Sequence, residues 1–374
     1  MTATAADFQS PVDRMSQGRW LYTRRWDLIF ISLSVVLVTV PYLSWLLVRD
    51  VLHIESDIGR QGVNLAVAVL IGGPHMYTTF TRTAFDKNYR SKHRAILVSS
   101  LVIPVVVISL ALSNLPLLLT IFFFWASIHV LHQIVYVVES YNEKAKTAPG
   151  KTSLTPLSKA VDFAVVLTAL YPLAAYRIAV TQDFTIGPTA LNDVIPNIFE
   201  QPWVVVLAFL VFGVSLVAFI VKTVTEFREG TAHVPKVVFI SVTVTASFIV
   251  PALGNLDTAF QGMNVWHSFQ YLALTWYANR LREERGQLDR QPLLKSISEE
   301  GHARKYYGFN LLMTFGAGIL IAISFMVLYF LLGGKWADPR YAFETSYYIG
   351  VLSILWIHYY HDHFLFTKTD SMVA

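Results

Sequence analysis

The sequence contains no cysteine and few charged residues, and both absences restrict what the chain can be. Without cysteine, disulfides, thiolate metal ligands and cysteine nucleophiles are excluded, so a bound metal must be held through nitrogen or oxygen. Charged residues occupy 14% of the 374 positions and hydrophobic residues 54%. A soluble domain would carry about 25% charged residues. The chain is therefore not expected to fold as a water-soluble globule.

Several functional motifs are also missing. The sequence has no phosphate-binding glycine loop, no serine nucleophile elbow and no strand-borne nucleotide site. The formal net charge of +4 is small, and we expect no nucleic-acid partner. The first residues are polar and precede the first apolar run without a signal-peptide core or cleavage site, so they are expected to be a retained tail.

What the chain does have is apolar runs of about 20 residues, the length that a helix needs to cross the hydrocarbon core of a bilayer. Because backbone polar groups in lipid must be satisfied within their own segment, continuous runs predict helices rather than barrel strands. The predicted fold is therefore all-α, a polytopic integral membrane helix bundle of about ten transmembrane helices. The predicted spans are 28–48, 62–81, 96–113, 115–138, 160–181, 203–222, 237–253, 257–279, 309–332 and 344–366.

The distribution of basic residues orients these spans. Lys and Arg accumulate on the cytoplasmic side of a membrane protein. With the N-terminus inside, all but five of the 29 basic residues fall in cytoplasmic segments. The five on the outer side are Arg49, Arg60, Arg177, Lys335 and Arg340. Both termini are therefore predicted to be cytoplasmic.

The same reading divides the chain into three parts. We expect a cytoplasmic tail over 1–27, a single transmembrane domain over 28–366, and a C-terminal tail over 367–374. The largest polar segment, 280–306, is predicted to be a cytoplasmic loop with room for a short interfacial helix.

Seven of the 11 histidines fall inside the predicted spans, although polar groups at membrane depth are costly and normally mark a functional site. They are His75, His129, His132, His267, His358, His361 and His363. All seven lie on the second, fourth, eighth and tenth spans, which run from outside to inside. Each lies in the middle or the cytoplasmic half of its span, so one shared site is the economical interpretation.

Helical spacing groups polar side chains in the fourth span. His129, His132, Gln133 and Tyr136 follow one another at i, i+3, i+4 and i+7, which places them on one face. In the second span, by contrast, the single His75 follows Gly72, Gly73 and Pro74, where proline frees a carbonyl and glycine allows close helix approach.

The two later spans show related patterns. His358, His361 and Asp362 share a face, whereas His363 points about 200° away from His361 and is not expected to be a ligand. His267 shares its face with other polar side chains that suit a supporting role around a metal, namely Asn264, Gln270 and Tyr271.

Converging imidazoles on four helices favour a transition metal, because neutral imidazole suits iron, copper, zinc and nickel. The metal-ligand candidates are His75, His129, His132, His267, His358 and His361. Iron, as one or two non-haem ions, is preferred because a site inside the bilayer meets lipid-soluble substrates and dioxygen. Zinc is a second option, and a polar network that joins the helices without a metal is the alternative to any metal.

At four motifs the chain resembles the bacterial and archaeal Brp/Blh-type β-carotene 15,15'-dioxygenases. That family has a Gly-x-Pro-His motif, then an Ile-His motif, then a His-containing helix, then a His and an Asp near the C-terminus. The matching segments here are GGPH at His75, SIHVLHQ at His129, VWHSFQ at His267 and IHYYHDHF at His358. The resemblance covers about 40 residues of short motif. It implies a multi-pass membrane protein with histidine-ligated non-haem iron, located in the inner (cytoplasmic) membrane of a bacterium.

The chain also departs from that pattern. The family's acidic residue after the first motif has no counterpart after His75, and His132 and His361 are additional histidines. These differences fit a relative with another lipophilic substrate or with a two-metal site.

The sequence thus predicts an iron-dependent oxidoreductase, oxygenase-like or desaturase-like, acting with dioxygen on a lipophilic substrate such as a carotenoid, an isoprenoid or a fatty-acyl chain. Membrane lipid surrounds it, and the redox partner, if one is needed, is unidentified. Tyr136, Gln133 and Gln270 are the candidate catalytic residues that orient ligands or intermediates.

Two alternatives remain from the sequence. The first is a quinone-linked electron-transfer protein with haem held by histidines on facing helices, which leaves the i, i+3 doubling of histidines unexplained. The second is a transporter or proton relay that uses buried histidines, for which an acidic residue near mid-membrane is the usual requirement.

Overall fold

The computed structural model describes residues 18–147, 154–186 and 189–366. The outer parts of the two predicted tails, 1–17 and 367–374, lie outside the described residues. The described chain is almost entirely helical, with a single antiparallel hairpin in which β1 (Thr185–Ile186) pairs with β2 (Thr189–Ala190). The all-α prediction is therefore confirmed for this part of the chain.

The helices form long rods, some of which contain π-helical or 3-10 turns. The first half comprises α2 (Arg24–Trp26), η2 (Asp27–Ser32), η3 (Leu33–Thr39), α3 (Val40–Leu46), η4 (Leu47–Val51), α4 (Ser56–Val67), η5 (Ala68–Gly72), α5 (Gly73–Arg82), α6 (Lys87–Lys92), α7 (Arg94–Ser99), α8 (Val102–Ser113), α9 (Leu115–Thr147), α10 (Pro156–Thr168) and α11 (Tyr171–Ala179). The second half comprises η6 (Asn192–Val194), η7 (Asn197–Glu200), α12 (Pro202–Arg228), α13 (Val234–Ile249), η8 (Val250–Ala252), α14 (Leu256–Glu284), α15 (Pro292–Ser298), α16 (Ala303–Met326), η9 (Val327–Leu332), η10 (Gly334–Ala337) and α17 (Pro339–Leu365).

Seven of the described helices are long and apolar enough to cross a membrane, so the chain has the composition of a multi-pass integral membrane protein. They are Arg24–Val51, Arg94–Ser113, Leu115–Thr147, Pro156–Ala179, Pro202–Arg228, Val234–Ala252 and Ala303–Leu332. The predicted count of about ten is not reached on these criteria. Three predicted spans form helices that do not meet these criteria, namely α4 to α5, α14 and α17, and all three carry histidines of the predicted site.

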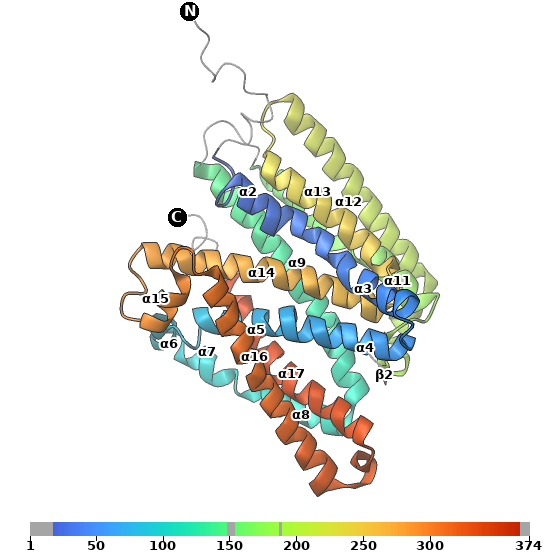
Figure 1. Cartoon of the computed structure of the whole chain (residues 1–374). Helices are drawn as coiled ribbons and strands as arrows, with labels where there is room; N and C mark the ends of the chain where they lie inside the picture. Colours follow the sequence, from blue (N-terminus) through green and yellow to red (C-terminus); the bar gives the residue numbers. More distant parts are fainter. Residues whose placement is uncertain (1–17, 148–153, 187–188, 367–374) are drawn as a thin grey trace, which may run out of the picture.

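Two of these rods, α14 and α17, and the α5 part of the third lie largely inside the bundle, whereas α4 exposes apolar side chains such as Ile58 and Leu65. Residues of α5, α14 and α17 are mostly buried, including all four of His75, Gln270, His358 and Asp362. In contrast, α12 and α16 expose large apolar side chains along much of their length. In Figure 1, α5 and α14 pass through the middle of the molecule, with α12 and α13 on one side and α8, α16 and α17 on the other. Exposed apolar surface of this kind is typical of helices that face lipid.

Two glycines allow the inner rods to approach their neighbours closely. A Cβ on Gly73 of α5 would lie 2.2 Å from Thr314 Cγ2 of α16, and one on Gly262 of α14 would lie 2.3 Å from the Val38 carbonyl oxygen of η3. No side chain fits at either position without moving a helix, because real contacts need about 3.5 Å or more. The backbones of these helices therefore meet at glycine, as is common in membrane bundles.

A buried ion network joins α10, α12 and α13. Asp162 accepts a hydrogen bond from Lys222 Nζ and forms an ion pair with Lys236 Nζ, each at 2.8 Å, and Glu226 Oε2 lies 3.2 Å from Lys222 Nζ. Two carboxylates and two ammonium groups balance one another, which is what the burial of charge requires. The predicted loop 280–306 contains the short helix α15, which packs against α14 and α16.

Candidate metal centre

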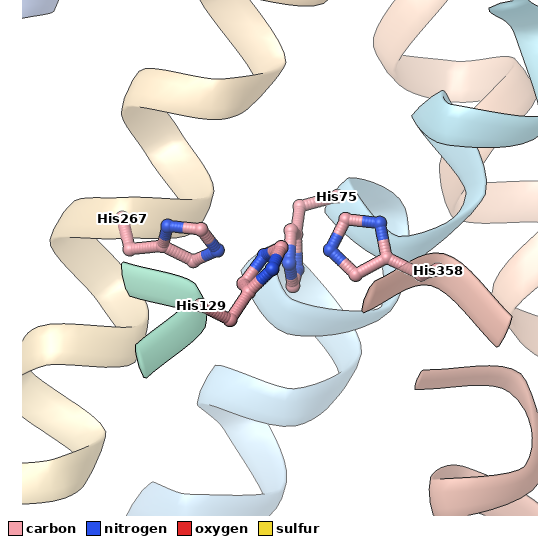
Figure 2. Close-up of side chains that lie close together, drawn as sticks. All are labelled: His75, His129, His267 and His358. Carbon is pink, nitrogen blue, oxygen red and sulfur yellow. The ribbon is translucent and has the colours of Figure 1, made fainter. Parts of the chain in front are cut away.

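Four helices bring one histidine each to a single buried point. The residues are His75 of α5, His129 of α9, His267 of α14 and His358 of α17, with 2%, 4%, 3% and 0% of their surface exposed. Figure 2 shows the four imidazoles pointing toward one another from separate helices. Because α5, α9, α14 and α17 come from distant parts of the sequence, only the folded bundle creates this cluster.

The four rings form a closed cycle of neighbours. Ring centroids are 5.1 Å apart for His75 and His267, 4.9 Å for His267 and His129, 4.9 Å for His129 and His358, and 4.6 Å for His358 and His75. Each residue offers one ring nitrogen, and these four atoms all lie within 4.8 Å of one another. Edge-to-face rings with converging nitrogens have the arrangement of a ligand set rather than of an aromatic stack.

Local sequence fixes the orientation of His75. Pro74 has no backbone N–H, so the helix loses the bond to the carbonyl of Leu70, and Tyr307 Oη donates to that carbonyl at 2.7 Å instead. His75 Nδ1 donates to the Gly72 carbonyl at 2.6 Å and also lies 3.0 Å from Ser268 Oγ. Since Nδ1 is the protonated nitrogen, Nε2 carries the lone pair. This Nε2 is buried and has no hydrogen-bond partner in the described structure.

Hydroxyl and carboxylate groups fix His358 in the same way. His358 Nδ1 lies 2.5 Å from Thr79 Oγ1 and 3.5 Å from Asp362 Oδ2. Thr79 Oγ1 and Tyr271 Oη both donate to Asp362 Oδ1, at 2.8 and 2.5 Å. Partners of this kind set the tautomer and ring plane of a metal-bound histidine. His358 Nε2, like that of His75, is left without a partner among the described residues.

The other two imidazoles have fewer restraints. His129 stacks on Tyr359, with centroids 4.1 Å apart, and its Nε2 lies 3.8 Å from Asp362 Oδ2 without a hydrogen bond. Neither ring nitrogen of His267 has a partner in the part of the chain that the structure describes. The cluster therefore contains at least four orphaned nitrogen atoms, one on each histidine.

These orphaned atoms fit a metal ion. Buried polar groups are normally paired, and an unpaired group costs about 1–3 kcal/mol. Two nitrogens that bind one ion at about 2.1 Å lie no more than about 4.2 Å apart, so small side-chain movements bring the four atoms within reach of a common ion. Asp362, fully buried beside His129 and His358, would place a carboxylate next to a bound cation. The residues present therefore fit a divalent transition metal.

Two of the six predicted ligand candidates lie outside the cluster. His132 is only partly buried and faces His363, with ring centroids 5.7 Å apart and Phe366 beside it. His361 is buried, and its ring lies beside that of Tyr89, with ring centroids 6.1 Å apart. The structure thus brings together His75, His129, His267 and His358, and it does not bring His132 or His361 to them.

Two of the three predicted catalytic side chains, Gln133 and Gln270, contact each other beside His267. Gln133 Nε2 donates to Gln270 Oε1 at 2.8 Å and to the His267 carbonyl at 3.3 Å, while Gln270 Nε2 donates to the Ile31 carbonyl. This pair joins α9, α14 and η2. Tyr136 stacks on Phe366 at 4.9 Å, and its hydroxyl has no partner among the described residues.

Thr79 is the residue near the metal centre that the sequence did not indicate. It contacts His358, Tyr271 and Asp362, and it lies four residues after His75. The i, i+4 spacing from a predicted ligand was the available signal, because such residues share a helix face. Tyr359, which stacks on His129, is the second such residue.

An apolar cavity of about 500 Å³ reaches the cluster from one side. Residues of α9, α11, α12 and α14 line it, and His267 and Tyr359 form part of its wall. The volume falls within the range of about 300–1,000 Å³ that is usual for small-molecule sites. The metal centre is therefore next to a space that can hold a molecule.

Fold and site together define a class, a multi-pass all-α membrane protein with four buried histidines that can hold a metal ion. No family model, no curated protein and no solved structure matches this chain.

Proposed function

We propose that the chain crosses the membrane ten times with both termini in the cytoplasm, as a protein of the bacterial inner membrane. The three rods that are too polar by composition are long enough to span, and their α5, α14 and α17 segments are mostly buried among neighbouring helices. Polar contacts at the proposed cytoplasmic end support this arrangement. Tyr277 Oη donates to the Leu21 carbonyl, Lys87 N to Gln291 Oε1, and Arg19 to the Ala232 carbonyl.

The proposed outer end is joined in the same manner. Arg177 donates to the Gly254 carbonyl at 2.5 Å, Thr189 Oγ1 donates to Glu344 at 2.6 Å, and Arg60 pairs with Asp257 at 2.6 Å. Each contact links segments that the ten-span topology assigns to the same side. A topology with fewer crossings would place some of these partners on opposite sides of the bilayer.

The proposed activity is that of a non-haem iron oxidoreductase, with one ion held by His75, His129, His267 and His358. Two observations carry this proposal: the four histidines each offer a ring nitrogen within 4.8 Å of the others, and each has a buried ring nitrogen without a hydrogen bond in the described structure. Nitrogen-only ligation from histidine suits iron, copper and zinc, and iron is preferred because dioxygen and apolar molecules concentrate in the bilayer. Bound iron would supply the oxidising chemistry with dioxygen, as an oxygenase-like or desaturase-like centre.

The protein's own residues would hold this centre and control protons around it. Thr79 and Tyr271 fix the Asp362 carboxylate, which in turn faces His129 and His358. The hydrogen bond from His358 Nδ1 to Thr79 keeps the lone pair of Nε2 directed at the cluster. The lipophilic substrate would be a carotenoid, an isoprenoid or a fatty-acyl chain, held in register by the apolar bundle.

The geometry argues against haem. A haem needs two axial nitrogens on opposite sides of a wide macrocycle, whereas the four imidazoles here are mutual neighbours with centroids 4.6 to 5.1 Å apart. A porphyrin plane has no space between rings that are this close.

Dioxygen uptake by the iron-loaded protein tests the proposed activity. The purified protein, loaded anaerobically with ferrous iron, would be mixed with dioxygen and with β-carotene, an isoprenoid alcohol or a phospholipid in turn, with and without an electron donor. We expect uptake that depends on one of these lipids and that His129→Ala abolishes. A Soret band in the purified protein, or no lipid-dependent uptake with any of the three, would contradict the proposal.

A further inference from the structure

The cavity beside the metal centre has a lining that is suited to an uncharged chain. None of the described residues that line it is charged. Ser127 Oγ and Thr168 Oγ1 turn to the backbone of their own helices, donating to the Phe124 and Ala164 carbonyls at 2.8 and 2.7 Å. Both hydroxyl groups therefore already donate their hydrogen to the backbone and add no free donor to the wall of the cavity. A carboxylate or phosphate placed here would be desolvated without a cation to pair with.

The dimensions of the cavity limit the length of that chain. Its lining on α14 runs from Leu256 to His267, and eleven residues at about 1.5 Å each give a path of about 16 Å. Its volume of about 500 Å³ holds about sixteen groups of water or methylene size, at about 30 Å³ each. One chain of about sixteen carbons fills such a space. A whole carotenoid has more than twice as many carbons and would leave much of its length outside.

The cavity has an apolar entrance and an inner end at the metal centre. Leu207 and Val211 of α12 and Ile128 of α9 line it and are 50%, 44% and 59% exposed, on the lipid-facing side of the bundle. The lining residues of α12 and α14 belong to the first turns of each helix, which the ten-span topology places toward the outer leaflet. At the other end stand His267, with both ring nitrogens free of hydrogen bonds in the described structure, and the Asn264 amide.

From these observations we infer that the cavity between α9, α11, α12 and α14 binds one uncharged lipid chain of about sixteen carbons, which enters from the outer leaflet and ends at His267. The inference rests on the proposed function for the reaction, but not for the binding of the chain. Among the three substrate classes, it selects a fatty-acyl or short isoprenoid chain over a whole carotenoid. The Asn264 side chain is the group that would receive an uncharged polar end of the chain.

Photolabelling with a diazirine-bearing hexadecanol tests the inference in the full-length protein, reconstituted in phosphatidylcholine vesicles. We expect crosslinks on α11, on the first turns of α12 and on Leu256–His267 of α14, mapped by peptide mass spectrometry. Excess hexadecanol should suppress them, and octanol at the same mole fraction should not. Crosslinks confined to lipid-facing positions such as Val214, or equal competition by octanol and hexadecanol, would overturn the inference.

Variants that fill the cavity provide the second arm. Ala208→Trp and Ala174→Trp add bulk to the lining of two different helices, and we expect each to reduce cavity labelling about fivefold or more. Val214→Trp is the matched control, because Val214 lies on the same helix as Ala208, is 71% exposed and does not line the cavity. Unchanged labelling in both filled variants would overturn the inference. The competition arm needs only the wild-type protein, so it decides alone if a variant does not fold.

The test separates this inference from the proposed function. In His129→Ala, which should lose the metal, labelling of the cavity should persist. Labelling without any bound metal in the wild-type protein would therefore refute the iron centre and leave the lipid site. A fully metal-loaded protein whose cavity is not labelled would refute the lipid site and leave the iron centre.

Discussion

Replacing Gly73 with alanine should weaken the metal centre by moving the helix that carries His75. The new Cβ would lie 2.2 Å from Thr314 Cγ2, 2.7 Å from Thr314 Oγ1 and 3.0 Å from the Ala68 carbonyl oxygen. Carbon atoms in contact need about 3.5 Å, so α5 and α16 must separate by about 1.3 Å. Rotation of Thr314 gives little relief, because both of its branches are too close and its Oγ1 is bonded to the Asn310 carbonyl.

The size of the effect follows from this displacement. His75 lies two residues after Gly73, so its Nε2 moves with the backbone away from the other three nitrogens. Overpacking of this kind costs about 1–3 kcal/mol of stability. Disturbing the orientation of a metal ligand typically lowers affinity by about 10- to 100-fold. We therefore expect Gly73→Ala to fold with a lowered thermal midpoint and to bind metal more weakly within that range.

Competition with a chromophoric chelator measures the affinity, and two further variants make the test specific. Gly318→Ala on α16, where an added Cβ meets nothing within 4 Å, should behave like wild type. Thr314→Ala removes both clashing atoms, so combining it with Gly73→Ala should restore most of the lost affinity. If Gly73→Ala binds metal as tightly as wild type, or if the double variant is no better than the single one, the packing argument is refuted.

Three further predictions concern residues around the cluster and at the proposed cytoplasmic end. Asp362→Asn should fold and should bind metal about 10- to 100-fold more weakly in the chelator assay, because His358 and the cation lose their carboxylate; unchanged affinity would contradict the role given to Asp362. His132→Ala and His361→Ala should each keep full metal content by elemental analysis, because neither lies in the cluster. Burial lowers the pKa of His233 from 6.5 to about 3. Below about pH 6.5 the unfolded chain therefore binds a proton at His233 that the folded chain does not bind. The free energy of unfolding should consequently fall by about 1.4 kcal/mol for each pH unit, down to about pH 3. In His233→Asn, which keeps a helix-capping side chain, denaturant unfolding in detergent should show a smaller fall between about pH 6.5 and about pH 5, and an equal fall would contradict this cause.

Much of the fold follows from one-dimensional patterns. Helices are present at all ten predicted spans, and seven of them also have the length and the apolar content to cross a membrane. The sequence alone could not separate lipid-facing from buried rods. α14 and α17 carry enough polar residues to fall below the hydropathy of a typical span, and their place inside the bundle depends on tertiary packing such as the approach of Gly262 to Val38.

The sequence predicts which helices contribute to the site, but not which histidine of each helix lies in the cluster. Histidines at i and i+3 lie on roughly the same face, so spacing alone included His132 and His361 with the cluster members. A bundle presents only one turn of each helix to a given point, and that turn carries His129 on α9 and His358 on α17. Which turn reaches the centre depends on how the helices cross, and this information is distributed over the whole chain.

The hydrogen bonds around the ligands show the same limit. Asp362 shares the helix face of His358, and that relation was visible in the sequence. Its partners Thr79 and Tyr271 come from α5 and α14, and no local pattern connects these residues. Contacts between helices that are far apart in the chain become evident only when the four rods are placed together.

The metal content of the purified protein tests the iron centre itself. Elemental analysis after anaerobic purification should give one transition-metal ion per chain, predominantly iron, in the wild-type protein. Replacing His75, His129, His267 or His358 by alanine should reduce this value strongly, while His132→Ala should leave it unchanged. A wild-type protein with far less than one ion per chain of any transition metal, or a metal content that is unaffected by all four replacements, would contradict the proposal that these histidines hold a metal.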